Sequence, residues 1–462
     1  MEPKREKLGS RLGFILLSAG CAIGMGNVWK FPWMTGQYGG ATFVLIYIGF
    51  LILLGIPVMT IEFAIGRAAQ KSPVKMYQEI EPKGSKWHAH GVVSYVANWL
   101  LIMFYSVVTG WMFYYFICML TGKFDKMTPD DISGVFSNML GSPKIMIIAL
   151  LVVVALGFLV LGFGVQNGLE KVTKIMMVML LGLMIVLAIR AIGLPGGAEG
   201  LKFYLKPSLE PIKEKGLWTI VNAAMNQAFF TLSLGIGSMA IFGSYINKDR
   251  ALLGESCNVV ILDTFVAIAA GLIIFPSCSA FGVDAGSGPS LIFVTLPNIF
   301  ANMPNGRLWG SFFFLFMCFA AFSTILAVCE NIVACTMELF NVSRVKSCIG
   351  CGVVMFILSI PCALGFNIWS GFEPFDVGSN IMDLEDFLVS NIALPLGALT
   401  YVLFTVINKK GWGWDNFIAE ANTGKGLKFP KGIRYYMMIV VPIIIVFTFI
   451  MGLIDKFGYL FN

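Results

Sequence analysis

Two short stretches of the sequence combine small residues with polar side chains inside long apolar runs. They lie at 20–27 and 231–238 and include Asn27 and Thr231. Glycines at this density interrupt a helix, and an interrupted helix presents free N–H groups with positive character and free C=O groups with negative character. Carbonyl, amide and hydroxyl oxygens suit a small hard cation, whereas free N–H groups suit a carboxylate. The chemistry predicted is therefore reversible binding rather than covalent catalysis.

Three carboxylates also lie inside apolar runs, namely Glu62, Asp263 and Glu330. An ionisable side chain costs about 2.5–3.5 kcal/mol at the centre of a membrane span, so each is a functional hypothesis. We expect Glu62 to accept hydrogen bonds from interrupted backbone and Glu330 to bridge helices. By contrast, His88 and His90 are interpreted as solvated loop residues, and no enzyme activity is expected.

The elements that carry these residues must be membrane helices. The 462 residues have a mean hydropathy of +0.82, with 57% hydrophobic and only 13% charged residues, whereas soluble domains carry about 25% charged residues. This composition excludes a cytoplasmic enzyme, a disordered chain and a nucleic-acid binder. The ten cysteines lie mostly in apolar runs and are interpreted as core residues.

Eleven windows are long and apolar enough to cross a bilayer as helices, which predicts an all-α polytopic membrane protein without a soluble domain. The windows lie near 12–36, 41–66, 91–121, 145–162, 173–193, 217–243, 257–281, 310–338, 348–366, 386–407 and 435–454.

The two interruptions fall in the first and sixth windows, which predicts two five-helix repeats of opposite orientation with binding at the broken helices. Close helix packing through small residues is the alternative interpretation of the glycines. We expect repeats over 12–193 and 217–407, an N-terminal segment over 1–11, an outer lid loop over 282–309 and an extra helix over 435–454.

Lys and Arg residues gather on alternate connections, which predicts the orientation in the membrane. Of the 32 Lys and Arg residues, 21 fall in six clusters, at 4–11, 67–86, 171–174, 248–250, 344–346 and 409–434. The connection at 367–385 contains four acidic residues and no Lys or Arg. We therefore expect a cytoplasmic N-terminus, an extracytoplasmic C-terminus and a plasma membrane location, typical of a bacterial inner membrane.

Several motifs of this chain resemble those of the neurotransmitter:sodium symporter family. They are RLGF at 11–14, GMGNVWKFP at 24–32, GG at 39–40, GIP at 55–57, EFAIGR at 62–67, QAFFTLS at 227–233 and GPSLIFVTLP at 288–297. The resemblance runs from Arg5 to about residue 410, and eleven spans are common among bacterial members.

This resemblance implies two sodium ions and no organic cofactor. The first ion would be held by the carbonyl of Ala22, by Asn27, Thr231 and Asp263, and by the substrate's carboxylate. The second would be held by the carbonyls of Gly20, Ile23 and Ala320 and the hydroxyls of Ser323 and Thr324.

The resemblance also implies a substrate site between the broken helices. Monoamine-transporting relatives have an aspartate where this chain has Gly24, so the substrate should carry its own carboxylate. Tyr105 should bond that carboxylate, and Phe230 should cover the site. The expected lining is Cys21, Ala22, Gly24, Gly26, Leu101, Tyr105, Phe230, Thr231, Ser233, Ile236, Thr324 and Val328. An apolar, uncharged lining predicts a neutral hydrophobic amino acid, and the choice between aliphatic and aromatic stays open.

Asp263 aligns where many relatives have a sodium-contacting asparagine, and Ala267 aligns with the serine of chloride-dependent relatives. We hypothesise that Asp263 provides the negative charge that chloride provides elsewhere, which would make transport chloride-independent. A neutral Asp263 that serves only as a hydrogen-bond partner is the alternative. We expect Glu62 to be the second fixed negative charge of this region.

Two gates are implied on either side of the site. Lys30 with Asp386 matches the outer pair, although relatives commonly have arginine at position 30, and lysine lacks its bidentate fork. The inner pair would be Arg5 with Glu338, supported by Tyr245.

Two alternatives remain open from the sequence. A proton-coupled amino-acid carrier of the same architecture would not need the sodium-binding oxygens, and a channel-like or receptor protein would bind without net transport. The expected partners are a small amino acid and the lipid bilayer, with no nucleic acid; protein partners are not predicted.

Overall fold

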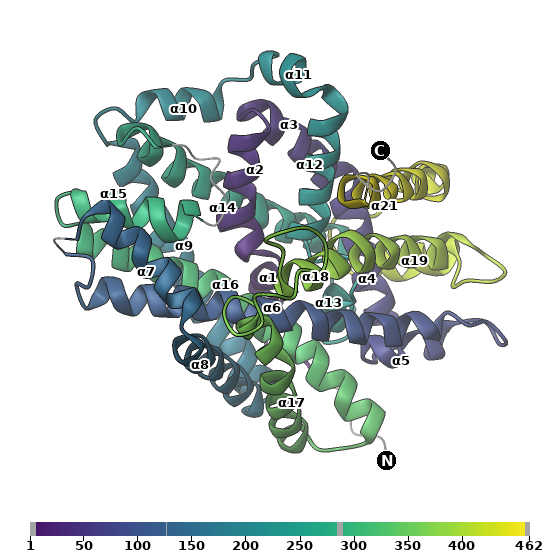
Figure 1. Ribbon diagram of the computed structural model, residues 1–462. Helices are drawn as coiled ribbons and strands as arrows, with labels where there is room; N and C mark the ends of the chain where they lie inside the picture. The colour runs from purple at the N-terminus through teal and green to yellow at the C-terminus, as the bar shows by residue number, and fades with distance from the viewer. Residues whose placement is uncertain (1–5, 126, 284–289, 458–462) are drawn as a thin grey trace.

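The computed structural model describes residues 6–125, 127–283 and 290–457, and over these ranges every regular element is a helix (Figure 1). The apolar elements, in chain order, are α1 (Arg11–Ala22) with η1 (Gly26–Lys30) and α2 (Phe31–Gln37); α3 (Ala41–Phe50) with η2 (Leu51–Gly55) and α4 (Ile56–Ala69); α6 (His88–Leu120); α8 (Pro143–Gly162); η3 (Val165–Glu170) with α9 (Lys171–Ile192); α12 (Leu217–Thr231) and α13 (Ser238–Gly243); α14 (Leu252–Ala280); α16 (Gly306–Phe340); α17 (Arg344–Leu364); α18 (Ile381–Phe387) with η5 (Leu388–Ala393) and α19 (Leu394–Val406); and η7 (Tyr436–Val440) with α21 (Val441–Phe457).

Each apolar window of the sequence coincides with one of these helices or helix groups. Among the described residues nine helices are long and apolar enough to cross a membrane, or ten when the bent pair of α1 with η1 and α2 is taken as one span. The all-α polytopic architecture is therefore confirmed. The eleventh span, which would be the interrupted α12 and α13, and the division into two inverted repeats stay predictions.

Several spans are interrupted where the sequence places proline. The π-helical turns η1, η2, η4 (Leu291–Thr295), η5 and η7 are each followed by a helix whose second residue is proline. Proline lacks an N–H and clashes with the carbonyl four residues earlier, so a wider turn relieves the clash. Each of these prolines therefore follows a widened turn.

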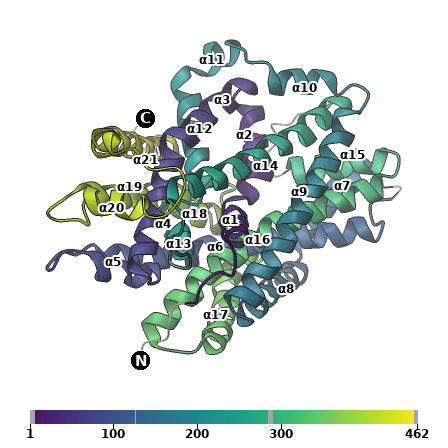
Figure 2. The same cartoon turned by 180° about the vertical axis from the view of Figure 1, so that it is seen from behind.

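Short helices occupy the connections at the two ends of the molecule. α7 (Pro129–Gly141), α10 (Ala198–Leu205) and α15 (Leu296–Asn302) lie at one end, and α5 (Pro73–Ile80) and α20 (Trp414–Ala421) lie at the opposite end (Figures 1 and 2). α11 (Glu210–Lys215) and the turn η6 (Lys431–Ile433) complete the connections. Alternate connections therefore share an end, as the charge pattern predicts; which end faces the cytoplasm stays a prediction.

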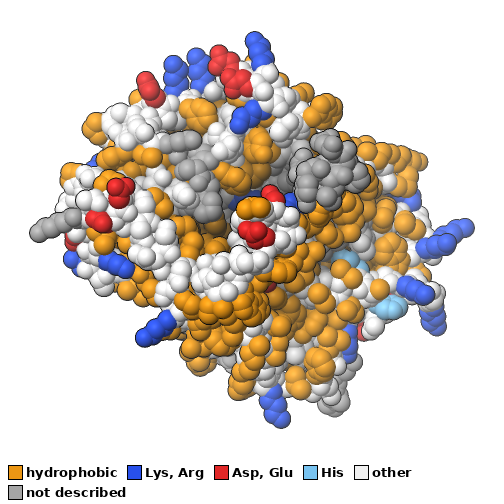
Figure 3. Space-filling model, in the orientation of Figure 1, with side chains coloured by type: hydrophobic (Ala, Val, Ile, Leu, Met, Phe, Trp, Pro, Cys, Tyr) orange, Lys and Arg blue, Asp and Glu red, His pale blue; other side chains and the backbone are white. Residues whose placement is uncertain are grey.

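The spans surround one central helix. In α16, 83% of the most apolar stretch is buried, the largest share of any span in the described chain, and α16 packs along α6. Figure 3 shows one face of this assembly, on which hydrophobic side chains form a broad band and most of the visible Lys and Arg side chains lie at the edges. Such a band matches a lipid-facing surface.

The placement of the two histidines in a loop is wrong, whereas the side chain of His88 is 42% exposed to solvent, as expected. Both lie in the first turn of α6, where His88 Nδ1 is 2.5 Å from Glu81 Oε1 and His90 Nδ1 is 2.9 Å from the Tyr77 hydroxyl. Burial opposes ionisation of Glu81, but hydrogen bonds from His88 and Ser85 outweigh it and lower the pKa of the Glu81 carboxyl. The histidines therefore hold α5 against α6.

Candidate functional site

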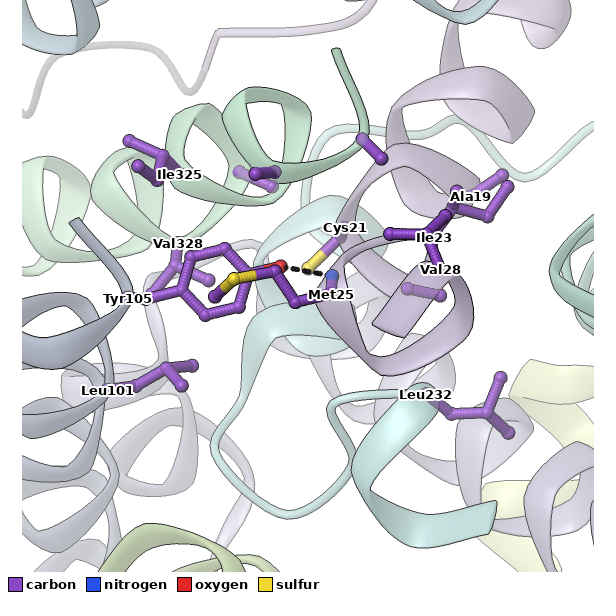
Figure 4. Close-up of a cluster of buried hydrophobic side chains, with 14 of the residues drawn as sticks. Ala19, Cys21, Ile23, Met25, Val28, Leu101, Tyr105, Leu232, Ile325 and Val328 are labelled. Atoms are coloured by element: carbon purple, nitrogen blue, oxygen red, sulfur yellow. Dashed lines mark hydrogen bonds between the residues drawn. The ribbon is translucent and has the colours of Figure 1, made fainter. Parts of the chain in front are cut away.

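The break between α1 and η1 brings backbone into the centre of the molecule. The two segments meet at an angle of 53°, and the freed N–H of Met25 donates to the hydroxyl of Tyr105 at 2.8 Å (Figure 4). Gly24 is obligatory in this arrangement because a Cβ there would lie 2.1 Å from Tyr105 Oη and 2.6 Å from Thr324 Oγ1. An aspartate at this position has no room.

The break between α12 and α13 is a turn with several left-handed residues. Ser233, Gly235 and Gly237 have φ values of 50°, 97° and 77°, which glycine adopts without strain. The N–H of Gly235 donates to Glu62 Oε1 at 2.6 Å. The expectation that Glu62 accepts a hydrogen bond from the interrupted backbone is thus confirmed.

The residues predicted for the first sodium site lie together and are fully buried. Asn27 Nδ2 donates to Asp263 Oδ1 at 2.8 Å and to the Asp263 carbonyl at 3.0 Å, while Thr231 Oγ1 lies 3.2 Å from Asp263 Oδ1. Tyr47, which the sequence did not single out, approaches Asp263 Oδ2 at 3.4 Å. The N–H of Gly24 donates to Asn27 Oδ1 at 3.1 Å. The hydroxyl of Thr231 and the carboxylate of Asp263 face each other here, whereas the Asn27 amide presents Nδ2 to Asp263 and its oxygen to the Gly24 N–H. The oxygens of this buried cluster could serve as ligands of a hard monovalent cation.

The residues predicted for the second sodium site also meet, between α1 and α16. Thr324 Oγ1 lies 3.2 Å from the carbonyl oxygen of Gly20 and 3.3 Å from that of Ile23. Ser323 Oγ donates to the carbonyl of Ala320 at 3.0 Å. Within the described ranges no three His, Cys, Asp or Glu side chains gather as metal ligands. Neutral carbonyl and hydroxyl oxygens here fit sodium better than a transition metal.

Between the two clusters lies a small cavity of about 20 Å³. Nine residues predicted for the substrate line it, namely Cys21, Ala22, Gly24, Gly26, Leu101, Tyr105, Phe230, Ser233 and Thr324. The predicted Thr231, Ile236 and Val328 are buried but are not among its lining residues. Figure 4 shows the Tyr105 ring beside Val328 and Leu101, with its hydroxyl directed at Met25. The only hydrogen-bonding side chains in the lining are Tyr105, Ser233, Thr324 and the thiol of Cys21, so the cavity suits an apolar group.

Sequence reasoning missed several residues of this region. Val389 and Leu394, from η5 and α19, complete the cavity lining. Gln227 Nε2 donates to the Gly26 carbonyl at 2.7 Å, and Asn98 Nδ2 donates to the Ile236 carbonyl at 2.7 Å. Gln227 lies in the motif at 227–233 that the sequence had already singled out, whereas Val389 and Leu394 are apolar residues in an apolar window and nothing in the sequence distinguished them.

The outer gate residues are not paired with each other. Lys30 Nζ lies 3.9 Å from the centre of the Phe230 ring, and Asp386 accepts a hydrogen bond from Ser390 at 2.7 Å. Lys30 and Asp386 are both described, and no ion pair joins them. Lys30 instead holds the ring that covers the cavity through a cation–π contact.

The opposite side of the site is held by a polar cluster. Tyr245 donates to Glu330 Oε1 at 2.5 Å, and Arg344 binds both oxygens of Glu330 at 2.7 and 2.8 Å. Glu330 therefore bridges α16 and α17, as expected. Glu338 accepts hydrogen bonds from the N–H and hydroxyl of Ser72. Arg5, the predicted partner of Glu338, lies outside the described residues.

Broken apolar helices around a buried cavity with two oxygen clusters define a membrane transporter with a central binding site. Comparison with known proteins agrees. The model of the sodium:neurotransmitter symporter family matches residues 5–129 and 131–460. The sodium-dependent transporter YhdH of Bacillus subtilis is 34% identical over 98% of this chain and 99% of its own length. The sodium- and chloride-dependent taurine transporter of Homo sapiens is 25% identical over all of this chain and 80% of its own.

A solved structure shares the fold as well. The crystal structure of MhsT in complex with L-phenylalanine superposes with a TM-score of 0.87 and 36% identity, covering 97% of this chain and all of that one. This chain belongs to the sodium:neurotransmitter symporter family. It is a multi-pass, sodium-dependent membrane transporter and not an enzyme.

Proposed function

We propose that this protein takes up a neutral hydrophobic L-amino acid, aliphatic or aromatic, together with two sodium ions by alternating access. The observation that carries the proposal is the uncharged cavity between two oxygen clusters at the broken helices. The amino acid's carboxylate would meet the Tyr105 hydroxyl and the freed N–H groups, and its side chain the apolar lining. The L-phenylalanine bound in the MhsT complex supports this substrate class.

The proposed ion sites keep the composition predicted from the sequence. Ala22, Asn27, Thr231 and Asp263 would hold the first sodium ion, and Gly20, Ile23, Ala320, Ser323 and Thr324 the second. Two sodium ions crossing about 100 mV with a tenfold gradient supply roughly 7 kcal/mol, which corresponds to about a 10⁵-fold accumulation of a neutral solute. No organic cofactor enters this scheme.

We further propose that transport is chloride-independent because Asp263 provides the negative charge beside the first ion. Asp263 is fully buried, and its carboxylate is contacted by the hydrogen-bonding groups of Asn27, Thr231 and Tyr47. Because no cationic side chain is among these contacts, a bound sodium ion would be the counter-charge.

The binding site would open to one side of the membrane at a time. Lys30 and Asp386 would form the outer gate, and Arg5, Glu338 and Tyr245 would form the inner gate. The N-terminus would be cytoplasmic and the C-terminus extracytoplasmic, in a plasma membrane.

Sodium-dependent binding of a panel of neutral amino acids to the purified protein tests the proposal. We expect hydrophobic members alone to bind, and Thr231→Val to weaken sodium dependence because it removes one ligand and keeps the shape. Thr264→Val is the matched control, since the Thr264 hydroxyl bonds only the carbonyl of Val260 in its own helix.

Uptake into proteoliposomes separates the other function classes. We expect uptake only with an inward sodium gradient, and labelled substrate should exchange in counterflow. Uptake that follows a proton gradient without sodium would contradict the proposal in favour of a proton-coupled carrier. Binding without counterflow would indicate a receptor.

A further inference from the structure

The carbonyl of Ile236 in the break between α12 and α13 is held by two amide side chains. Asn98 Nδ2 in α6 donates to it at 2.7 Å, and Asn331 Nδ2 in α16 approaches it at 3.4 Å. Both side chains are about 1% exposed. A carbonyl freed from a helix inside a membrane protein needs such a donor. We name Asn98 and Asn331 the amide clamp.

Other hydrogen bonds fix the orientation of both amides. Asn98 Nδ2 also donates to the carbonyl of Ser94 at 2.7 Å, and Asn98 Oδ1 lies 3.5 Å from the hydroxyl of Ser238. Asn331 Oδ1 accepts from the thiol of Cys335 at 3.4 Å. The clamp thus ties the broken helix to two neighbouring helices.

The clamp belongs to the same helix faces as the cavity. Asn98 precedes Leu101 by three residues and Tyr105 by seven, and Asn331 follows Thr324 by seven. Residues at these spacings lie on one face of a helix. Leu101, Tyr105 and Thr324 line the cavity. The clamp therefore supports the break one turn or two beyond the residues that contact the substrate.

Backbone packing fixes the break on the side of α19. A Cβ on Gly235 would lie 2.2 Å from the Leu394 carbonyl oxygen, and one on Gly397 would lie 2.0 Å from the Gly235 carbonyl oxygen. The support from α6 and α16 comes instead from side chains that a substitution can remove.

We propose that Asn98 and Asn331 are positioning residues that set substrate specificity, because they hold the Ile236 carbonyl and so fix the depth of the cavity beside Ser233. This inference rests on the proposed function, since it presupposes an amino acid side chain in the cavity. A substrate with a small side chain keeps its contacts with the cavity wall only while the break between α12 and α13 is held in place. A substrate with a large aromatic side chain still fills the cavity when the break relaxes and the cavity becomes deeper.

The size of the effect follows from one hydrogen bond. Net contributions of single hydrogen bonds correspond to about a 2- to 12-fold change in an equilibrium constant. We expect Asn98→Leu, which keeps the branched shape of the side chain and removes the donor, to weaken leucine and valine binding by about 3- to 10-fold. Phenylalanine and tryptophan binding should change by less than about twofold. Asn331→Leu should act in the same direction but less, because its contact is longer.

The experiment measures sodium-dependent binding of these four amino acids to purified wild-type protein and to the variants. Asn298→Leu is the matched control, because Asn298 Nδ2 donates only to the Val294 carbonyl in its own helix; its leucine-to-tryptophan affinity ratio should equal that of the wild type. Thermal unfolding in detergent confirms that each variant is folded, and Asn331→Leu serves if Asn98→Leu does not fold.

The outcomes separate the two proposals. A leucine-to-tryptophan affinity ratio that falls in the clamp variants supports the inference. An equal loss for all four amino acids, no loss, or a larger loss for the aromatic ones overturns it and leaves the proposed function intact. A wild-type protein that binds none of the four with sodium overturns the proposed function itself.

Discussion

Replacing Asp263 by asparagine removes one negative charge from the first ion cluster and keeps the shape of the side chain. Asp263 Oδ1 lies 2.8 Å from Asn27 Nδ2 and 3.2 Å from Thr231 Oγ1, and a sodium ion liganded by Asp263 would lie about 3 Å from the centre of the carboxylate charge. At an effective dielectric constant of about 20, unit charges at that distance attract by about 5–6 kcal/mol. The asparagine dipole recovers part of this, so the expected loss is about 2–4 kcal/mol.

That loss corresponds to about a 30- to 700-fold weaker apparent sodium affinity. The assay is sodium titration of amino acid binding in purified protein, with chloride or gluconate as the anion. We expect the wild type to respond equally in both salts. Asp263→Asn with Ala267→Ser should recover sodium affinity in chloride alone, since the added hydroxyl gives an anion a ligand.

Two results would refute this reasoning. Wild-type uptake that collapses in gluconate would show that Asp263 does not replace chloride. Unchanged sodium affinity of Asp263→Asn in gluconate would show that Asp263 is neutral in the working protein and acts only as a hydrogen-bond partner. Thr264→Val serves again as a control from the same helix.

Three further predictions concern sterics, a buried ion pair and pH. Gly24→Ala should weaken amino acid binding at least about tenfold while leaving a folded protein, because its Cβ enters the cavity; equal binding in a titration would contradict the described break. Arg344→Leu should destabilise the protein by about 3–5 kcal/mol, because Glu330 would remain buried without its partner; thermal unfolding in detergent measures this, and Glu330→Gln added to Arg344→Leu should restore part of it. The lowered pKa of Glu81 means that its bonds to His88 stabilise the folded state above the ordinary carboxyl pKa of about 4.5 and lose this effect as pH falls through the lowered value. Glu81→Gln should therefore lower the unfolding temperature at pH 7 more than at pH 4, and an equal shift at both would contradict this.

The sequence by itself determined the elements and most of the site's composition. Apolar windows fixed the spans because the bilayer core sets the length of a helix and the helix satisfies its own backbone. Glycines beside Asn27 and Thr231 marked the breaks because close helix packing, the other use of glycines in an apolar run, does not require polar side chains beside them. The family resemblance then supplied Ser323 and Thr324, which by themselves look like ordinary helix-bonded hydroxyls.

Tertiary structure alone decided which groups complete the site and which contacts hold it. Val389 and Leu394 are apolar residues in an apolar span, so only packing reveals that they line the cavity. The amide of Asn98 and the hydroxyl of Tyr47 reach partners more than a hundred residues away in the chain, at Ile236 and Asp263. Lys30 lies over the Phe230 ring, and Asp386 is bonded to Ser390 instead. The sequence could not predict this, because the distance between the two gate residues depends on how their helices pack. Residue types specify which groups can bind, whereas long-range packing specifies which of them meet.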